Sequence, residues 1–281
     1  MKLRRPALAG LLAGLLASPL FPQDASLPDG NLLVRELVGK QRHREEILDR
    51  YTYDLLEIRE EIAKDGRVKD RKSRRYQVFY VKGRPLRKLV AVDERPLSTE
   101  VKAKEERRVT EAAQAIARGQ VATEQPGLRL SAILERYDFR TVGREAVEGR
   151  PAFVLEFTPR PGNRKLDSDH LLRKLSGRIW VDEEEREVVR ARVHNTGGIK
   201  IALGLGASVS SLEFSLEFRK VGGELWLPLR IETEAAGRVL LVKGFRTRAT
   251  TSYGNYQRFW VESEEDIRPS PAPSPELGSV R

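Results

Sequence analysis

Hydrophobic residues recur along this chain with two spacings, one typical of helices and one typical of strands. The helical spacing appears first in Asn31–Tyr51, where Asp29 stands at the expected N-cap. It returns after Ser98, a second N-cap that is followed by Glu100 in the first turn. A third helix is indicated by residues at i, i+3, i+4 and i+7, namely Leu130, Ile133, Leu134 and Tyr137. The pattern therefore predicts three amphipathic helices.

The rest of the chain alternates apolar and polar residues with the period of a strand. The stretches "SSLEFSLEFRK" and "ELWLPLRIETE" are the clearest examples, and each predicts a strand with one apolar face. Their apolar residues are Leu212, Phe214, Leu216 and Phe218 in the first stretch, and Leu225, Leu227, Leu229 and Ile231 in the second. Turn signals break the strands at Asp65-Gly66, Lys82-Gly83, Glu148-Gly149 and Gly222-Gly223. We expect nine to eleven strands.

Strands with one apolar and one polar face are typical of an antiparallel sheet that is covered on one side. Three amphipathic helices need an apolar surface to cover, and this sheet needs a cover. The predicted fold class is therefore α+β: a large curved antiparallel sheet, with about three helices in its concave face.

The two ends of the chain have a different composition. Residues 1–23 combine a basic start with a short apolar run, which is typical of a signal peptide and too short for a membrane span. Residues 267–281 are rich in proline and predict an extended, disordered tail. We expect a single domain between them, at residues 24–266, in a protein exported to the periplasm.

Composition excludes several chemistries. The chain has no cysteine, so it has no disulfide, thiol nucleophile or cysteine-bound metal. Its 51 basic and 41 acidic residues give a net charge of +10 and are mixed along the chain. For an exported protein this charge fits a well-solvated surface or contact with anionic lipid head groups better than binding to nucleic acid. We expect a monomer.

The stretch Gly177–Val193, "GRIWVDEEEREVVRARV", holds five carboxylates in six residues, at Asp182 to Glu185 and Glu187. These residues could form a metal site, an acid/base pair or the solvated tip of a hairpin. Both flanks alternate with period two and end at the acidic run, which favours the hairpin. The spacing does not match a calcium-binding loop, which needs oxygens at alternate positions and a central glycine. We therefore expect no metal site.

Catalytic signals are weak. Of three histidines, only His170, in "KLDSDHLLRK", stands among residue types used in hydrolases. A catalytic triad is assembled from separate elements, however, and Asp-Ser-Asp before an apolar run is also typical of a turn that enters a helix. No dinucleotide-binding or phosphate-binding loop is present, and we expect no cofactor and no enzyme activity.

The order of these elements resembles the LolA-like superfamily of bacterial exported proteins, which includes lipoprotein carriers, RseB and LppX-type lipid carriers. The "GRIWVD" hairpin, with its "VVRARV" return, and the late "YGNYQRFWV" strand carry the resemblance, over Asn31 to Glu262. It implies an unclosed β-barrel with helices as a lid and an apolar cavity that holds acyl chains. The helical insertion between Ser98 and Tyr137 departs from the small carriers, and no functional residue transfers one to one.

We therefore expect a non-enzymatic periplasmic protein that binds lipid, or a lipidated protein, in an apolar cavity between sheet and helices. The eight apolar residues of the two clearest strands are the candidate cavity residues, although the same residues could be ordinary core. One alternative is an envelope sensor or scaffold that binds protein partners through an exposed patch. Another is a hydrolase of unknown type that uses His170.

Overall fold

The computed structural model describes residues 26–48, 50–120, 130–162, 171–201, 207–223, 225–239 and 243–258. The predicted signal peptide, the predicted tail and His170 lie outside these residues. The helices are α1 (Gly30–Leu48), α2 (Thr99–Ala117) and α3 (Leu130–Leu134), with a 3-10 turn η1 (Leu172–Lys174). The strands are β1 (Tyr51–Ile62), β2 (Val68–Val81), β3 (Arg84–Val92), β4 (Arg95–Pro96), β5 (Tyr137–Val147), β6 (Arg150–Pro159), β7 (Leu175–Asp182), β8 (Val188–Asn195), β9 (Ile199–Ile201), β10 (Ala207–Val221), β11 (Leu225–Val239) and β12 (Lys243–Arg258).

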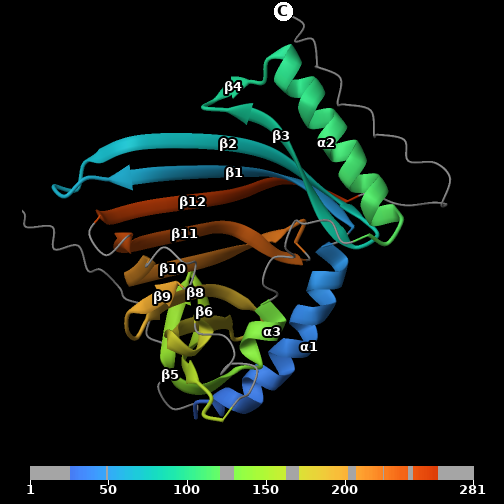
Figure 1. The fold of residues 1–281 in the computed structure, drawn as a ribbon. Coiled ribbons are helices and arrows are strands. Elements are labelled where there is room, and N and C mark those ends of the chain that lie inside the picture. The colour runs from blue at the N-terminus through green and yellow to red at the C-terminus, as the bar shows by residue number, and fades with distance from the viewer. Residues whose placement is uncertain are drawn as a thin grey trace, which may run out of the picture.

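The strands of the described residues form a single sheet of 12 strands, in the order β4-β3-β2-β1-β12-β11-β10-β8-β7-β6-β5, with β9 paired to β10. All pairings are antiparallel, and the two ends of this order, β4 and β5, do not pair with each other, so the sheet is not closed. The last strand, β12, lies between β1 and β11 (Figure 1). The predicted α+β class and the unclosed sheet are confirmed.

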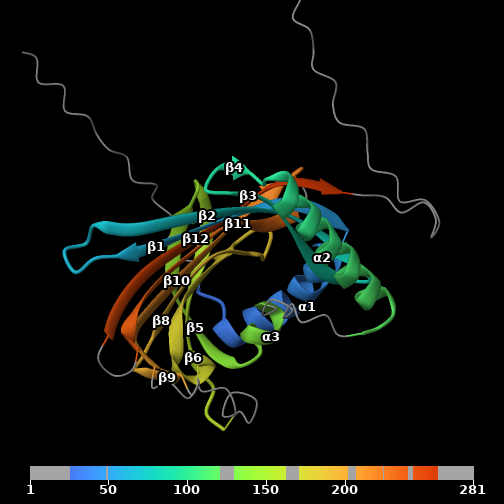
Figure 2. The ribbon, with the colours of Figure 1, turned by 45° about the horizontal axis from the view of Figure 1, so that its top comes forward.

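The helices differ from the prediction in number and in place. Only α1 and α2 are long, at 19 residues each, while the third predicted helix is the single turn α3. Tyr137, expected on the third helix, instead begins β5 and is buried. The sheet curves around α1 and α3 (Figure 2), whereas α2 lies beside β3 at one edge (Figure 1). Two long helices and the single turn α3, rather than three amphipathic helices, therefore cover parts of the sheet.

The first helix begins where the sequence indicates and is anchored on the edge strand. The Asp29 side chain accepts a hydrogen bond from the Leu32 amide at 2.9 Å, which confirms the predicted N-cap. A Cβ on Gly30 would lie 2.6 Å from the carbonyl oxygen of Phe139, so only glycine allows this approach to β5. Asn31 Oδ1 in turn accepts the Phe139 amide at 3.0 Å.

The main hydrophobic core lies between α1, α3 and the half of the sheet formed by β5 to β8. One face of α1 is buried there, through Leu33, Val34, Leu37 and Val38. The ends of β10 and β11 join this core through Phe218 and Trp226. Each large apolar side chain buried in this way contributes about 1.5–3 kcal/mol, so this half carries much of the stability.

The predicted turns are confirmed by their backbone angles. The two-residue turns at Lys82-Gly83, Glu148-Gly149 and Gly222-Gly223 have positive φ at both positions, as a type I′ hairpin turn requires. Gly66, in the connection from β1 to β2, has a φ of +85°. Ser98 caps α2 through a hydrogen bond from the Val101 amide to its hydroxyl.

Candidate functional site: the inner face of the sheet

We call the sheet face on which α1 packs the inner face. Phe218 of β10 identifies it, because Phe218 lies in the core with α1 and the Arg44 guanidinium lies over its ring at 5.4 Å. Directly paired residues of an antiparallel sheet point to the same face, and each strand alternates between faces. The inner face can therefore be followed from strand to strand through the pairing register.

Three rows of paired residues cross the inner face from β10 to β2. The first is Leu216, Ile231, Thr251, Glu57 and Arg74; the second is Phe214, Thr233, Ala249, Arg59 and Lys72; the third is Leu212, Ala235, Thr247, Glu61 and Asp70. We call the nine members on β10, β11 and β12 the inner strip. They are apolar side chains on β10 and mostly small ones on β11 and β12.

The inner strip is intermediate between core and ordinary surface, and Leu216 at one side of it packs against the core. Eight of its nine residues are half-buried, and the ninth, Thr247, is exposed. Sheet order places the strip between β5–β8, over which α1 packs, and β3, against which α2 packs. The described helices thus leave a partly exposed, largely apolar surface between them.

The eight candidate residues do not form one set. Leu212, Phe214 and Leu216 belong to the inner strip, as does Ile231. Phe218 is 5% exposed and belongs to the core under α1, so its position is that of ordinary core. The candidates on β10 therefore share one face, as the alternation predicts, but differ in burial.

The expectation that the four residues of β11 share one face is wrong. A register shift lies between the pairs Glu217↔Arg230 and Phe218↔Pro228, which leaves Leu229 as an extra residue in a β-bulge. Beyond the bulge, Leu225 pairs with Val221 and Leu227 with Arg219, which puts both on the opposite face from Ile231. Leu227 is 1% exposed, so it is a core residue of that other face.

Three tyrosines extend the inner face beyond the strip. The ring of Tyr53 lies 5.9 Å from that of Tyr253 and 5.2 Å from that of Tyr256. The Tyr256 hydroxyl donates a hydrogen bond to the Pro228 carbonyl oxygen at 2.7 Å. Burial raises the pKa of Tyr253 to about 12 and raises that of Tyr256 further, so both stay neutral. Asn255, at a positive φ of 51°, forms the bulge that places Tyr256 here.

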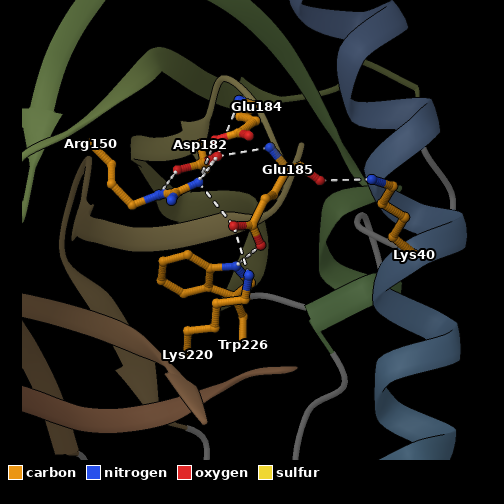
Figure 3. Close-up of polar contacts among 7 residues, drawn as sticks. All are labelled: Lys40, Arg150, Asp182, Glu184, Glu185, Lys220 and Trp226. Atoms are coloured by element: carbon orange, nitrogen blue, oxygen red, sulfur yellow. Dashed lines mark hydrogen bonds and ion pairs between the residues drawn. The ribbon is translucent and has the colours of Figure 1, made fainter. Parts of the chain in front are cut away.

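The acidic run is a hairpin turn, as predicted, but most of its carboxylates are not solvated. Asp182 is 1% exposed and accepts two hydrogen bonds from Arg150, at 2.7 and 3.0 Å. Glu185 accepts from Lys220 at 2.9 Å and from the Trp226 indole at 2.8 Å (Figure 3). The expectation of a wet tip holds only for Glu184, whose side chain is 82% exposed. The sequence could not indicate this burial, because the partners come from other strands.

This turn joins elements that are far apart in the sequence. Lys40 of α1 donates to the Glu185 carbonyl oxygen at 2.7 Å, and Arg44 of α1 forms an ion pair with Glu187 (Figure 3 shows Lys40). Burial lowers the pKa of Arg44 to about 10. We call this turn with its partners the acidic hub. Its carboxylates face bases rather than one another, and no group of three or more potential metal ligands occurs in the part of the chain that the structure describes.

Other polar groups near the sheet have structural partners. Trp180, beside the acidic hub, lies on the outer face, where Arg190 and Arg192 cover its ring and its indole donates to Glu145 at 2.8 Å. His194 lies 3.3 Å from the Ser176 hydroxyl. A polar hollow of about 240 Å³ on the outer face is lined by Ser215, Glu217, Arg230 and Glu232, and none of these is a candidate residue.

This chain is similar to several solved structures at low sequence identity. The sequence matches no protein-family model and no curated protein. Solved structures similar to this chain include an outer membrane lipoprotein-sorting protein domain from Vibrio parahaemolyticus, at 12% identity and a TM-score of 0.41, over 84% of this chain and 94% of that one. A LolA superfamily protein from Nitrosomonas europaea is similar at 12% identity and a TM-score of 0.36, over 84% of this chain and 96% of that one.

The Pseudomonas aeruginosa MucA/MucB complex is also among them, at 12% identity and a TM-score of 0.23, over 77% of this chain and 94% of that one. Within the described residues, no helix is both long and apolar enough to cross a membrane.

Proposed function

We propose that this protein is a non-enzymatic binding protein of the periplasm that holds the acyl chains of a lipid, or of a lipidated protein, against its inner strip. One observation carries the proposal: nine residues on three adjacent strands form a largely apolar surface that the described helices leave half-buried. Covering such a surface with an apolar ligand is favourable, because it removes apolar area from water.

The side chains of the strip suit a flexible, narrow ligand. Larger residues on β10, such as Phe214 and Leu216, stand beside small ones on β11 and β12, such as Thr233 and Ala249. Each methylene group buried there contributes about 0.8 kcal/mol, so a chain of about ten such groups contributes about 8 kcal/mol toward the roughly 4–15 kcal/mol that association costs.

The polar clusters favour binding over catalysis. The acidic hub uses its carboxylates to join α1, β6, β10 and β11 through ion pairs and hydrogen bonds. The composition of residues 1–23, which is typical of a signal peptide, supports the proposed location in the periplasm. Neither alternative function has a comparably specific feature among the described residues; His170, on which the hydrolase depends, lies outside them.

Two neighbouring threonines of β12 provide a matched test. Thr251 belongs to the inner strip, while Thr250 pairs with Glu232 and Ile58 on the outer face, and both are half-buried. Thr251→Glu places a carboxylate where an alkyl chain would lie, and we expect it to abolish binding of dodecyl maltoside measured by calorimetry. Thr250→Glu adds the same charge on the outer face. It is a matched control because Thr250 pairs with Glu232 just as Thr251 pairs with Glu57, and it should leave binding unchanged.

The same variants test the natural ligand. Native mass spectrometry of the protein purified from the cell envelope should show bound lipid in the parent and in Thr250→Glu, but not in Thr251→Glu. Binding that survives Thr251→Glu undiminished would place the ligand elsewhere and would contradict the proposal.

A further inference from the structure

The inner strip ends at two positive charges that have no ion-pair partner among the described residues. In the second row, Ala249 of β12 pairs with Arg59 of β1, which pairs with Lys72 of β2. In the first row, Thr251 pairs with Glu57, which pairs with Arg74. Arg59 and Arg74 therefore share the inner face with the strip, and both side chains are exposed.

Ion pairs account for the other charges on this part of the inner face. Glu57 accepts from Arg87 at 2.9 Å, Glu61 accepts from Lys69 at 2.7 Å, and Asp70 lies 3.4 Å from Lys72. Arg59 and Arg74 have no ion-pair partner within the described ranges. Two positive charges thus remain on the inner face of β1 and β2.

The spacing of these two arginines fits one anionic group. Arg59 pairs directly with Lys72, so Arg74 is its diagonal neighbour on the adjacent strand, at about 7–8 Å between Cα atoms. Two guanidinium groups that far apart can both reach the oxygens of one phosphate, to which arginine donates well-matched hydrogen bonds. Three strand spacings, roughly 14 Å, separate Phe214 on β10 from Arg59 on β1.

We propose that the ligand of the inner strip is an anionic lipid, whose acyl chain lies on the strip and whose phosphate is held by Arg59 and Arg74. This inference rests on the proposed function and adds the class of lipid. The apolar surface and the unpaired bases lie on one face and in continuous rows, so one amphiphile can contact both. The positive charges of Arg59 and Arg74 favour an anionic lipid over a zwitterionic or uncharged one.

The test compares dodecyl phosphate with dodecyl maltoside, each below its micelle concentration, by calorimetry on the full chain. We expect the phosphate to bind more tightly, and its affinity to fall as salt is added. The double variant Arg59→Gln/Arg74→Gln should weaken binding of dodecyl phosphate by about tenfold or more, and should change that of dodecyl maltoside by less than about twofold.

The outer face supplies the matched control. Arg75 and Arg246 lie on the same strands as the site, pair on the outer face with Leu56 and Ala236, and have no ion-pair partner within the described segments. Arg75→Gln/Arg246→Gln makes the same change in net charge and should leave both affinities unchanged. Circular dichroism spectra of the two double variants should match that of the parent, because all four side chains are exposed.

Each other outcome decides a different question. If both dodecyl compounds bind alike and the inner double variant changes neither, the anionic preference is wrong while the proposed function stands. If neither compound binds, the proposed function itself fails, and this inference fails with it. If inorganic phosphate alone displaces dodecyl phosphate at similar concentration, the arginines form a site for free phosphate, and the lipid assignment is overturned.

Discussion

At the scale of single residues, the Asp182 side chain accepts four hydrogen bonds in the acidic hub. It accepts two hydrogen bonds from Arg150 and caps the turn through the amides of Glu184 and Glu185, at 3.1 and 2.8 Å. We expect Asp182→Ala to lower the free energy of unfolding by about 2–3 kcal/mol, because hydrogen bonds to a buried charge are lost together with the turn cap.

Glu184→Ala is the control, since its exposed carboxylate lies 3.2 Å from the same Arg150. It should change the free energy of unfolding by less than about 0.5 kcal/mol. Urea unfolding followed by circular dichroism measures both variants, and equal losses would show that the hub does not depend on the buried carboxylate.

Asp182 also predicts how stability depends on pH. Burial alone would raise its pKa, but the hydrogen bonds from Arg150 and the turn amides outweigh burial and hold the pKa below its ordinary value of 3.8. In the acid range the unfolded chain therefore takes up this proton first. The contribution of Asp182 is complete above the ordinary pKa and is lost as pH falls below it toward the folded pKa.

We expect Asp182→Asn to reduce this acid dependence. Urea midpoints measured from about pH 5.5 down to about pH 2.5 should fall less steeply in the variant than in the parent. Parallel curves would mean that other carboxylates account for the acid sensitivity.

At the scale of elements, the two glycines of α1 differ in whether a side chain would fit. A Cβ on Gly30 would meet backbone atoms of Phe139 and Arg140, the nearest at 2.6 Å, whereas a Cβ on Gly39 would meet nothing within 4 Å. Gly30→Ala should destabilise the protein by about 1–3 kcal/mol through overpacking against β5. Gly39→Ala should stabilise it by about 0.5–1 kcal/mol, because alanine loses less entropy in a helix. Thermal unfolding of both variants checks the signs, and a shared sign would contradict the docking of α1 on β5.

Strand β10 separates core from candidate site within four residues. Phe218 is 5% exposed in the core, while Phe214 is half-buried in the inner strip. Phe218→Ala should cost about 3–5 kcal/mol of stability, and Phe214→Ala clearly less. Calorimetry with dodecyl maltoside should show the reverse ranking for binding in variants that remain folded. If Phe214→Ala is as destabilising as Phe218→Ala, the strip is ordinary core.

At the scale of the whole molecule, an unclosed sheet must protect its edges from pairing with other chains. The short strand β4 pairs with β3 only at Ala91 and Val92, and side chains of α2 cover part of the remaining edge of β3. Glu105 accepts the Leu89 amide at 2.7 Å, and Arg108 donates to the Arg87 carbonyl oxygen. The opposite edge, β5, receives the α1 contact at Phe139.

Removing this cover should expose β3. We expect Glu105→Ala/Arg108→Ala to increase self-association with concentration, because freed backbone groups of an edge strand pair with other chains. Glu106→Ala/Arg107→Ala, on the same helix, should behave like the parent. Sedimentation velocity distinguishes them, and identical profiles would mean that α2 does not protect the edge.

Local features of this fold could be predicted from the sequence because local chemistry determines them. Asp29 and Ser98 cap helices through their own side chains, and the glycine turns adopt the positive φ that glycine allows. The alternation in β10 also predicted its inner face, because β10 has no bulge between Leu212 and Phe218.

Features that depend on distant partners could not be predicted. The bulge at Leu229 moves Leu225 and Leu227 to the other face, although the sequence alternates without a break. Asp182 is buried because Arg150, from another hairpin, reaches it. Arg59 and Arg74 can be recognised as a candidate site only from the strand register and the ion pairs. These show that the acids nearby, Glu57 and Asp70, pair with other basic residues.

The central claim is that an acyl chain lies on the inner strip, and photo-crosslinking tests it most directly. A dodecyl phosphate analogue with a diazirine at the end of its chain would be bound, irradiated and located by peptide mass spectrometry. We expect adducts on strip residues of β10, β11 and β12, and their loss in Thr251→Glu but not in Thr250→Glu. Adducts that leave the strip unlabelled and fall on the outer face of the sheet would contradict it.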